Sequence, residues 1–329
     1  MARKSKPRAG SMAYYPRVRA KSIVPKFNSY GCLDDLNIDG CKPLCFYTFK
    51  AGMTYVIAKN AKQKASNYGQ DMSIPVTVLE TPDLKVVGAR FYKDYKSTVG
   101  KNAVFEFTLQ DKDFKKRIGG KKQKSPVSLE ESLKRKDDAN SLNLICLVQA
   151  SKTGIGQKVP VIVEVPLSGT YEQQIKYLQD KFNKVISVDN VFNKDDYLDA
   201  KSISIGHGFT GPVKRNGIKV QRPKHQQIQR HVGSINPWHP ATIMFTVPRP
   251  GQYGFHNRTT YNKKLLMIDT DADKVNPTKG FSNYGVVKNK YVLVAGNVPG
   301  PSKRIVVLRN AIRKHKYNLE IAEISYISK

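Results

Sequence analysis

The sequence predicts a mostly β protein that carries an α/β insertion and two basic extensions, one at the N-terminus and one as a long loop. Short runs rich in Val, Ile, Thr, Tyr and Phe recur at close spacing between Gly, Pro or Asn residues, which is the pattern of strands joined by turns. In the middle of the chain a capped helical pattern follows two such runs and indicates an α/β unit. Lysine and arginine gather in two segments that lack acidic residues, and this uneven charge predicts the extensions.

The close spacing of the first strands predicts a small barrel. These strands are expected at Leu44–Phe49, Thr54–Ala58, Ile74–Leu79, Lys85–Tyr92 and Ala103–Leu109. Buried strands are then expected at Leu142–Val148 and Val159–Val165, and strand patterning returns at Tyr284–Val287, Tyr291–Ala295 and Ile305–Leu308. The barrel is therefore expected to open twice, once for the α/β insertion and once for the long basic loop.

A helix is expected between Thr170 and Asn183. Thr170 is placed as its N-cap, and Gln173 follows at the spacing of a capping box. Ile175, Leu178 and Phe182 then share one helical face. Residues 111–140 alternate in charge sign, so we expect a solvated loop with a short helix there.

The net charge of +30 is concentrated in two segments. From Ala200 to Ile268 there is no Asp or Glu but eleven Lys or Arg, and residues 1–33 add eight basic and no acidic side chains. A basic stretch of this length, interrupted by Gly and Pro, is not expected to form an ordinary hydrophobic core. It requires a polyanion as its partner, and nucleic acid is the obvious one.

Other compositional features exclude several classes of protein. The N-terminal residues lack the apolar segment of a secretory signal, and no apolar run approaches the roughly 20 residues of a membrane helix, so we expect a soluble intracellular protein with no membrane partner. The cysteines, Cys32, Cys41, Cys45 and Cys146, are too few for a disulfide scaffold, and no second tight pair completes a zinc site. We therefore expect buried or free thiols and no metal or other cofactor.

Residues 206–211, GHGFTG, match the GxGxxG pattern of nucleotide-binding loops. The expected strand Ser202–Ile205 precedes them. However, Pro212 and the turn at Asn216 and Gly217 are expected to prevent a helix from opening at the third glycine. No acidic residue follows about 20 positions later to hold a ribose. The match is therefore not interpreted as a nucleotide-binding site.

Five of the six histidines and the only tryptophan lie in the acid-free run. The histidines, which are His207, His225, His231, His239 and His256, have no carboxylate or cysteine nearby in sequence to support catalysis or zinc binding, so stacking on bases is favoured. Trp238 is either a core residue or a residue at a loop tip. Pro237 and Pro240 bracket it and favour the tip, where it would stack on a base.

Several stretches carry a family resemblance. They are GSMAYYPRVRAKSIVP at 10–25, FKAGMT at 49–54, PVTVLETP at 75–82, GHGFTGPVKRNG at 206–217, PWHPATIMFTVPRPGQYGFHNRTTYNKK at 237–264 and PGPSKRIVVLR at 298–309. In order and content they resemble the family of large-subunit ribosomal protein three, in its archaeal and eukaryotic branch, and most closely its archaeal form.

The resemblance implies a translation-protein-type β-barrel and a role as a structural, non-catalytic constituent of the large ribosomal subunit in the cytoplasm. It divides the chain into an N-terminal extension (1–40), a barrel core (41–94, 199–206 and 265–329), an α/β insertion (95–198) and a finger (207–264). Trp238 lies near the tip of the finger, which reaches toward the peptidyl-transferase region. The implied partners are large-subunit rRNA of the 23S class and large-subunit proteins fourteen and archaeal twenty-four, with no homo-oligomer.

Charge, aromatic placement and resemblance together identify candidate rRNA-binding residues. They are Arg3, Lys4, Lys6, Arg8, Arg17, Arg19, Lys21, Lys26, His207, Lys214, Arg215, Lys219, Arg222, Lys224, Arg230, Trp238, His239, Arg249, Gln252, His256, Arg258, Lys263 and Lys264. The alternatives are an RNA-modifying or RNA-processing enzyme that uses the basic loop as a substrate clamp, and a DNA-compacting protein.

Overall fold

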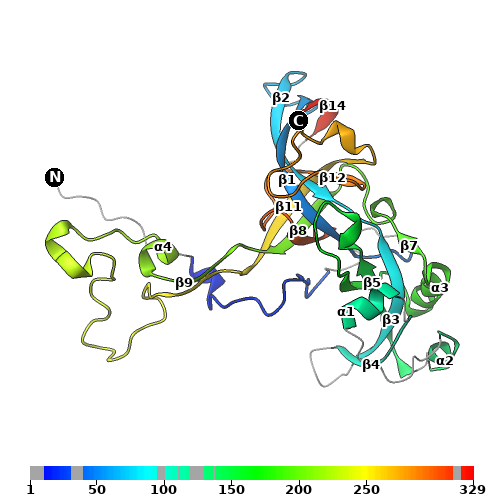
Figure 1. Cartoon of the computed structure of the whole chain (residues 1–329), viewed down its shortest axis with the longest axis horizontal. Helices are drawn as coiled ribbons and strands as arrows, with labels where there is room; N and C mark the ends of the chain where they lie inside the picture. Colours follow the sequence, from blue (N-terminus) through cyan, green and yellow to red (C-terminus); the bar gives the residue numbers. More distant parts are fainter. Residues whose placement is uncertain are drawn as a thin grey trace. The chain divides into compact units, whose positions relative to one another are not determined.

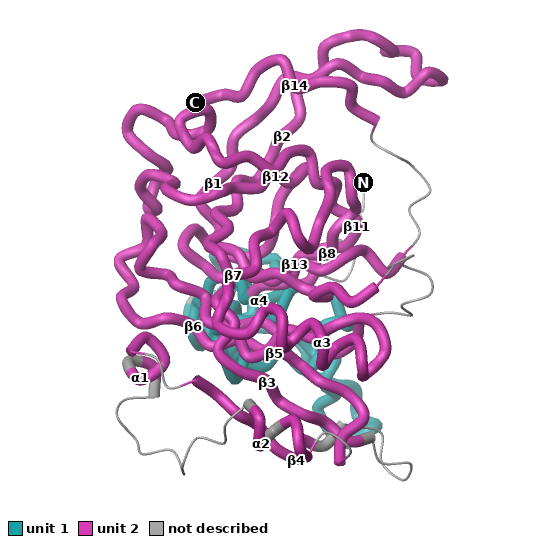
Figure 2. Tube along the Cα trace, turned by 90° about the vertical axis from the view of Figure 1, so that its right-hand side faces the viewer, with its two compact units in different colours: residues 1–23, 203–258 teal, residues 24–202, 259–329 magenta. Residues whose placement is uncertain are grey.

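The computed structural model describes residues 11–30, 40–94, 101–109, 112–118, 129–135, 138–313 and 320–329. The described chain is mostly β, as the sequence predicts. It divides into two compact units, which are distinguished by colour in Figure 2. Unit 1 comprises residues 1–23 and 203–258, and unit 2 comprises residues 24–202 and 259–329.

The larger sheet of unit 2 closes on itself. Its strands, in spatial order, are β13 (Ile305–Asn310), β8 (Tyr197–Ile203), β11 (Asn257–Asp269), β12 (Tyr291–Ala295), β2 (Asp71–Glu80), β1 (Cys45–Asn60) and β14 (Ile321–Ile327). The first part of β1 also pairs with β13, from Cys45 opposite Arg309 to Phe49 opposite Ile305, and its last part pairs with β14. Six strands are thus hydrogen-bonded in a ring, which is the connectivity that a barrel requires.

Strand β1 is continuous where two strands were expected. Between Lys50 and Gly52 its register with β2 shifts, so a bulge replaces the expected turn. A Cβ atom at Gly52 would lie 2.6 Å from the Phe281 ring, so any other residue would have to displace that ring. The Lys50 ammonium group donates hydrogen bonds to the carbonyl oxygens of Val298 (2.6 Å) and Gly300 (3.1 Å), which compensates for its burial.

The second sheet of unit 2 has the order β4 (Lys101–Thr108), β3 (Leu84–Asp94), β5 (Ser141–Val148) and β6 (Val161–Pro166), and β7 (Val185–Ile186) pairs with β3. Figure 1 shows the helices α1 (Lys112–Ile118), α2 (Leu129–Lys134) and α3 (Tyr171–Lys181) grouped around it. Strand β3, which the sequence assigned to the barrel core, belongs to this sheet because it pairs along its length with β5. Two short helices occupy the charged segment where one was expected.

Helix α3 begins as predicted. The Thr170 backbone N–H donates to Gln173 Oε1 at 3.1 Å, which is one half of the capping box. Leu178 is fully buried on the predicted face, and the Phe182 ring lies 5.6 Å from that of Phe107 on β4.

One hydrophobic core joins the two sheets of unit 2. It contains Phe46 and Tyr291 from the ring of strands, and Phe91, Leu144 and Leu178 from the second sheet and α3. Because both sheets bury side chains in the same cluster, they stabilise each other.

The expected strand Tyr284–Val287 is a turn, held by the buried carboxylate of Glu80. This carboxylate accepts hydrogen bonds from the Tyr284 hydroxyl and from the backbone N–H groups of Lys288 (2.9 Å) and Asn289 (3.0 Å). The turn therefore supplies hydrogen-bond donors to a buried carboxylate. Strands β11 and β14 were not expected, and β11 begins inside the acid-free run.

The described cysteines are free thiols, as expected. Cys45 and Cys146 are buried, and burial raises the pKa of Cys45 to about 12. Cys41 is partly buried, and Cys32 lies outside the described residues. None of the helices in the described part of the chain has the length and apolar character needed to span a bilayer.

Candidate nucleic-acid interface

Unit 1 is built on a two-stranded ribbon. Strands β9 (Gly206–Thr210) and β10 (Gly251–Gly254) pair antiparallel, and the rings of His207 and Tyr253 stack with centroids 5.0 Å apart. Gly254 has a φ of +74°, and a Cβ atom there would lie 2.0 Å from the Ile205 carbonyl oxygen. The ribbon closes this tightly because Gly254 has no side chain.

A short helix does open at the third glycine of the GxGxxG segment, contrary to the expectation. Helix α4 spans Pro212–Asn216, with Gly211 as its N-cap and Gly217 in the left-handed conformation at its end. Proline at the first helical position has the required φ and lacks only an N–H that would be unpaired there, so it starts the helix. The helix has a single turn, and the acidic residue of a dinucleotide site is still missing from the sequence.

The loop between α4 and β10 exposes its apolar side chains. Trp238 is 88% exposed, which excludes it from the core, and Phe245 is 70% exposed. Phe209, on β9, is 79% exposed. The short 3-10 helices η1 (Met12–Tyr14) and η6 (Pro223–Ile228) complete the unit. Among its described residues only Ile203 and Pro212 are buried apolar side chains, so unit 1 lacks a hydrophobic core of its own.

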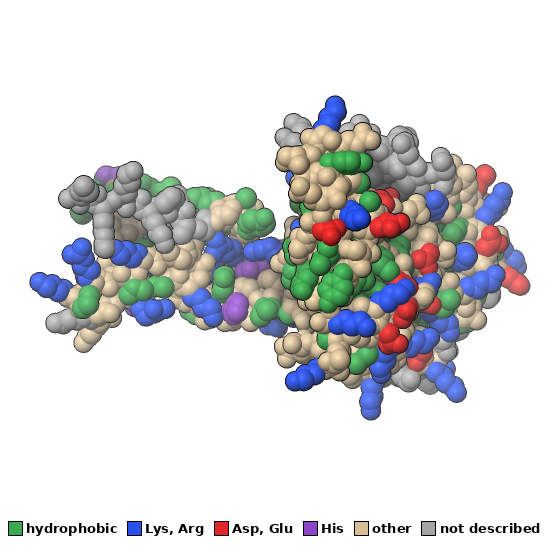
Figure 3. All heavy atoms as spheres, turned by 90° about the horizontal axis from the view of Figure 1, so that it is seen from above, with side chains coloured by type: hydrophobic (Ala, Val, Ile, Leu, Met, Phe, Trp, Pro, Cys, Tyr) green, Lys and Arg blue, Asp and Glu red, His purple; other side chains and the backbone are tan. Residues whose placement is uncertain are grey.

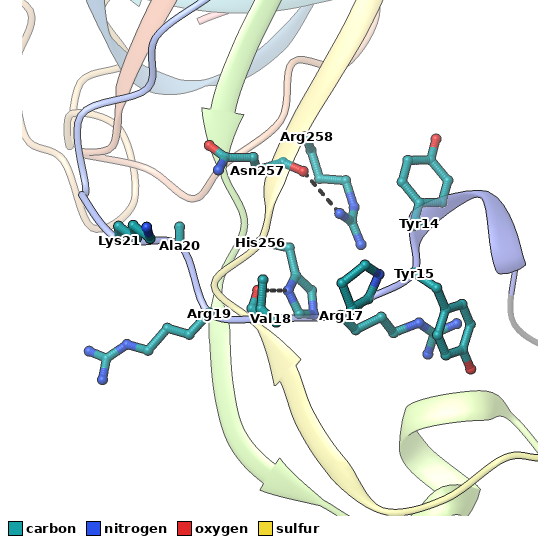
Figure 4. Close-up of a pocket in the computed structure, with 11 residues that line it drawn as sticks. Tyr14, Tyr15, Arg17, Val18, Arg19, Ala20, Lys21, His256, Asn257 and Arg258 are labelled. Carbon is teal, nitrogen blue, oxygen red and sulfur yellow. Dashed lines mark hydrogen bonds between the residues drawn. The ribbon is translucent and has the colours of Figure 1, made fainter. Parts of the chain in front are cut away.

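The N-terminal segment lies along the base of the ribbon. The Ala20 N–H donates to the Phe255 carbonyl oxygen at 2.8 Å, and His256 Nδ1 lies 2.8 Å from the Val18 carbonyl oxygen (Figure 4). Because a carbonyl oxygen only accepts, Nδ1 carries the proton of the His256 imidazole. These contacts bring together two basic segments that are far apart in the sequence.

Unit 1 contains no carboxylate side chain. Its residues include 15 Lys or Arg, so the unit supplies half of the net charge of +30, and all 26 acidic residues belong to unit 2. Every red sphere in Figure 3 is therefore part of unit 2. Ion pairs between side chains of unit 1 cannot neutralise its cations, so the unit is suited to bind a polyanion.

The whole chain, residues 1–329, matches the family model for ribosomal protein L3. The chain belongs to the ribosomal protein L3 family. It is 39% identical to large ribosomal subunit protein uL3 of Methanococcus vannielii, over 99% of this chain and 97% of that protein. The uL3 protein of Methanococcus aeolicus is 41% identical over 99% of this chain and 97% of its own length. That of Archaeoglobus fulgidus is 37% identical over 98% and 97%. The resemblance seen in the sequence is confirmed.

In this L3-family chain the predicted binding residues differ in exposure. Most are exposed: Arg19, Lys21, Lys26, Lys214, Lys219, Arg222, Lys224, Arg230, His207, Trp238, His239 and Arg249. Partly buried are Arg17, Arg215, Gln252, Arg258 and Lys263, and His256 and Lys264 are buried. Arg3, Lys4, Lys6 and Arg8 lie outside the described residues.

Lys264 does not fit the predicted role. Its side chain is buried, and its ammonium group pairs with the Asp195 carboxylate at 2.8 Å. This partner comes from outside the acid-free run, so the pair was not predictable from the run itself. We therefore assign Lys264 a role in the fold of unit 2 and not in rRNA binding.

Arg215 and His256 act within the protein. Arg215 donates to the carbonyl oxygens of Gln252 (3.0 Å) and Arg249 (2.7 Å), and so ties α4 to the end of the loop. Burial, together with the positive charges of Arg258, Arg17 and Arg215, lowers the pKa of His256. Its neutral imidazole therefore links the ribbon to the N-terminal segment through the hydrogen bond to Val18.

Two exposed aromatic residues escaped the sequence analysis. Phe209 and Phe245 present their rings to solvent, as Trp238 does. The available signal was a large apolar side chain, next to glycine or threonine, inside a basic run without acidic residues. Exposed aromatics of this kind offer stacking surfaces for unpaired bases.

Proposed function

We propose that this chain is a structural component of the large ribosomal subunit and that its unit 1 binds large-subunit rRNA of the 23S class. One observation carries the proposal: unit 1 combines 15 basic side chains with no acidic ones, and its described residues form no hydrophobic core. A surface of this kind gains its stabilisation from phosphate groups, which release counterions when lysine and arginine neutralise them.

The two kinds of exposed side chain have different roles. Basic residues of the loop, such as Lys219, Lys224 and Arg230, contact phosphates and position the chain. Trp238, at 88% exposure, stacks on an unpaired base. Unit 2 provides a rigid base, since its two sheets share one core.

Three finer features belong to the same proposal. The loop that carries Trp238 extends toward the peptidyl-transferase region. The chain functions as an N-terminal extension, a barrel core, an α/β insertion and a finger. Large-subunit proteins fourteen and archaeal twenty-four are its protein neighbours, and its place of action is the cytoplasmic ribosome.

The proposed role is not enzymatic. Members of the L3 family are structural ribosomal proteins, and an RNA-modifying enzyme built on the basic loop would need an acid or a base near its substrate. Unit 1 has no carboxylate for this purpose. Its buried histidine, His256, has a lowered pKa, and its Nδ1–H is already donated to the Val18 carbonyl oxygen. A DNA-compacting role explains the charge but not the projecting tryptophan.

Sedimentation of the tagged chain in cell lysate tests the proposal. The chain is expected to migrate with large subunits and to leave them only at high salt, because its contacts are largely electrostatic. A chain that stays in the soluble fraction at physiological salt, while untagged large-subunit proteins sediment normally, would contradict the ribosomal role.

A further inference from the structure

A pocket of about 330 Å³ lies within unit 1, where the N-terminal segment meets the start of β11. Residues 14–21 form one wall and residues 256–258 the other (Figure 4). The hydrogen bonds of Ala20 to Phe255 and of His256 to Val18 hold these walls together. The pocket is therefore preformed, and its volume is in the range of small-molecule sites.

Two guanidinium groups at the pocket are oriented in advance. Arg258 lies over the Tyr14 ring, 4.6 Å from its centroid, and donates to the Asn257 carbonyl oxygen at 2.9 Å. Arg17 lies over the Tyr15 ring at 5.0 Å and donates to the Arg215 carbonyl oxygen at 3.0 Å. In each case the ring and the carbonyl restrict the side chain, so little conformational entropy remains to be lost when it binds a ligand.

No anion within the unit satisfies these two arginines. Neither forms an ion pair with the residues that the structure describes, and unit 1 has no carboxylate in its sequence. The remaining N–H groups of a guanidinium form a planar fork that matches two oxygens of a phosphate. Burial and, secondarily, the positive charges of Arg258, Arg17 and Arg215 lower the pKa of His256 at the same pocket.

The pocket also offers a surface for a base. Tyr14 is 55% exposed although Arg258 lies against its ring. An exposed aromatic beside a phosphate-binding pair is the arrangement by which proteins hold single-stranded RNA, where bases stack on rings and phosphates meet arginines. A free phosphate ion would use the arginines alone.

From this juxtaposition we propose that the pocket holds one unpaired RNA nucleotide, with its phosphate on Arg17 and Arg258 and its base against Tyr14. The inference rests on the proposed function, since it assigns to one site in unit 1 a specific share of the RNA contacts. It distinguishes this site from the exposed basic residues of the loop, which neutralise phosphate without a preformed pocket.

The test is equilibrium binding of a fluorescein-labelled single-stranded oligouridylate of about six nucleotides, a length within the site size of single-strand binding proteins, to the full chain. Fluorescence anisotropy is measured for the unaltered chain and for Arg258→Gln, Arg17→Gln, Tyr14→Ala and Arg222→Gln. Arg222 is exposed and lies outside the pocket, so Arg222→Gln is a control matched in charge to the arginine variants. Circular dichroism spectra and melting curves confirm that each variant is folded.

We expect Arg258→Gln and Arg17→Gln each to weaken binding about tenfold or more, because each removes an oriented charge-assisted contact. Tyr14→Ala should weaken binding roughly tenfold with an unchanged salt slope, since a stacking contact releases no counterion. Arg222→Gln should weaken it by less than about threefold, the loss of one exposed charge.

Equal losses for Arg258→Gln and Arg222→Gln, or no loss for Tyr14→Ala, would overturn the pocket and leave rRNA binding by unit 1 intact. Failure of the unaltered chain to bind both the oligouridylate and a 23S-class rRNA fragment would instead overturn the proposed function. Inorganic phosphate that competes with the oligouridylate at equal affinity per phosphate would show that the pocket binds anions in general. This result would contradict the proposal that the pocket holds a nucleotide.

Discussion

Replacing Trp238 by alanine distinguishes a core role of this side chain from a role in stacking on RNA. A core role predicts a loss of stability in the free protein, and a stacking role predicts a loss of affinity in the RNA complex. Trp238 is 88% exposed, so truncation removes little buried area from the free protein. We expect the free energy of unfolding to fall by less than about 0.5 kcal/mol, as for other surface substitutions. A core tryptophan would instead lose about 3–5 kcal/mol. In the RNA complex the lost stacking amounts to about 1–3 kcal/mol, or roughly 5- to 150-fold in affinity.

Urea unfolding of the free chain and binding to a 23S-class rRNA fragment measure the two effects. Tyr68→Ala is the control, because Tyr68 is a 57% exposed aromatic in unit 2 and should change neither quantity. Phe91→Ala, at a fully buried site, calibrates the loss expected for a core aromatic. A Trp238→Ala chain that unfolds as easily as Phe91→Ala, or binds RNA as tightly as the unaltered chain, would refute the stacking role.

Three further predictions concern buried charge, misplaced charge and pH. Asp199→Asn should lower the free energy of unfolding by about 3–5 kcal/mol. The Asp199 carboxylate lies 3.0 Å from the buried Arg309 guanidinium, and the substitution leaves this guanidinium without its counter-ion. A change below about 1 kcal/mol in urea unfolding would show that the pair is not buried. Lys219→Gln should reduce the slope of log affinity against log salt by about 0.7–0.9. Lys264→Gln should leave this slope unchanged and only destabilise the fold. Equal slopes for the two variants would show that Lys264 also binds RNA. Because the pKa of His256 is lowered in the folded chain, the unfolded chain binds the proton more tightly. The free energy of unfolding should therefore fall as the pH drops below about 6.5. His256→Asn should reduce this loss of stability, measured from denaturation curves at pH 7 and pH 5, and an identical pH dependence would exclude His256 as the source of the loss.

Features that depend on local sequence were predictable. Thr170 and Gln173 start a helix because they lie three positions apart, and the strands around Leu144 and Val292 follow from runs of β-branched and aliphatic residues. The basic character of unit 1 was equally local, since it follows from the absence of acidic residues over a long stretch. The proline bracket of Trp238 indicated its exposure.

Features that depend on distant partners were not predictable. The bulge in β1 needs Phe281 against Gly52, and the turn at Tyr284 needs Glu80, which lies 204 residues away in the chain. Lys264 leaves the binding set because of Asp195. In the pocket, Arg17 and Arg258 acquire their orientation only when the N-terminal segment meets the ribbon.

We propose that unit 1 provides the main rRNA contacts of this chain. Ultraviolet cross-linking of purified large subunits, followed by mass spectrometry of the peptides, measures this directly. We expect cross-links to rRNA to concentrate on peptides from residues 11–23 and 203–258, with Trp238 and Tyr14 among the linked aromatics, and to be sparse on β2 and β12. Cross-links confined to unit 2, with none on the loop that carries Trp238, would contradict the claim.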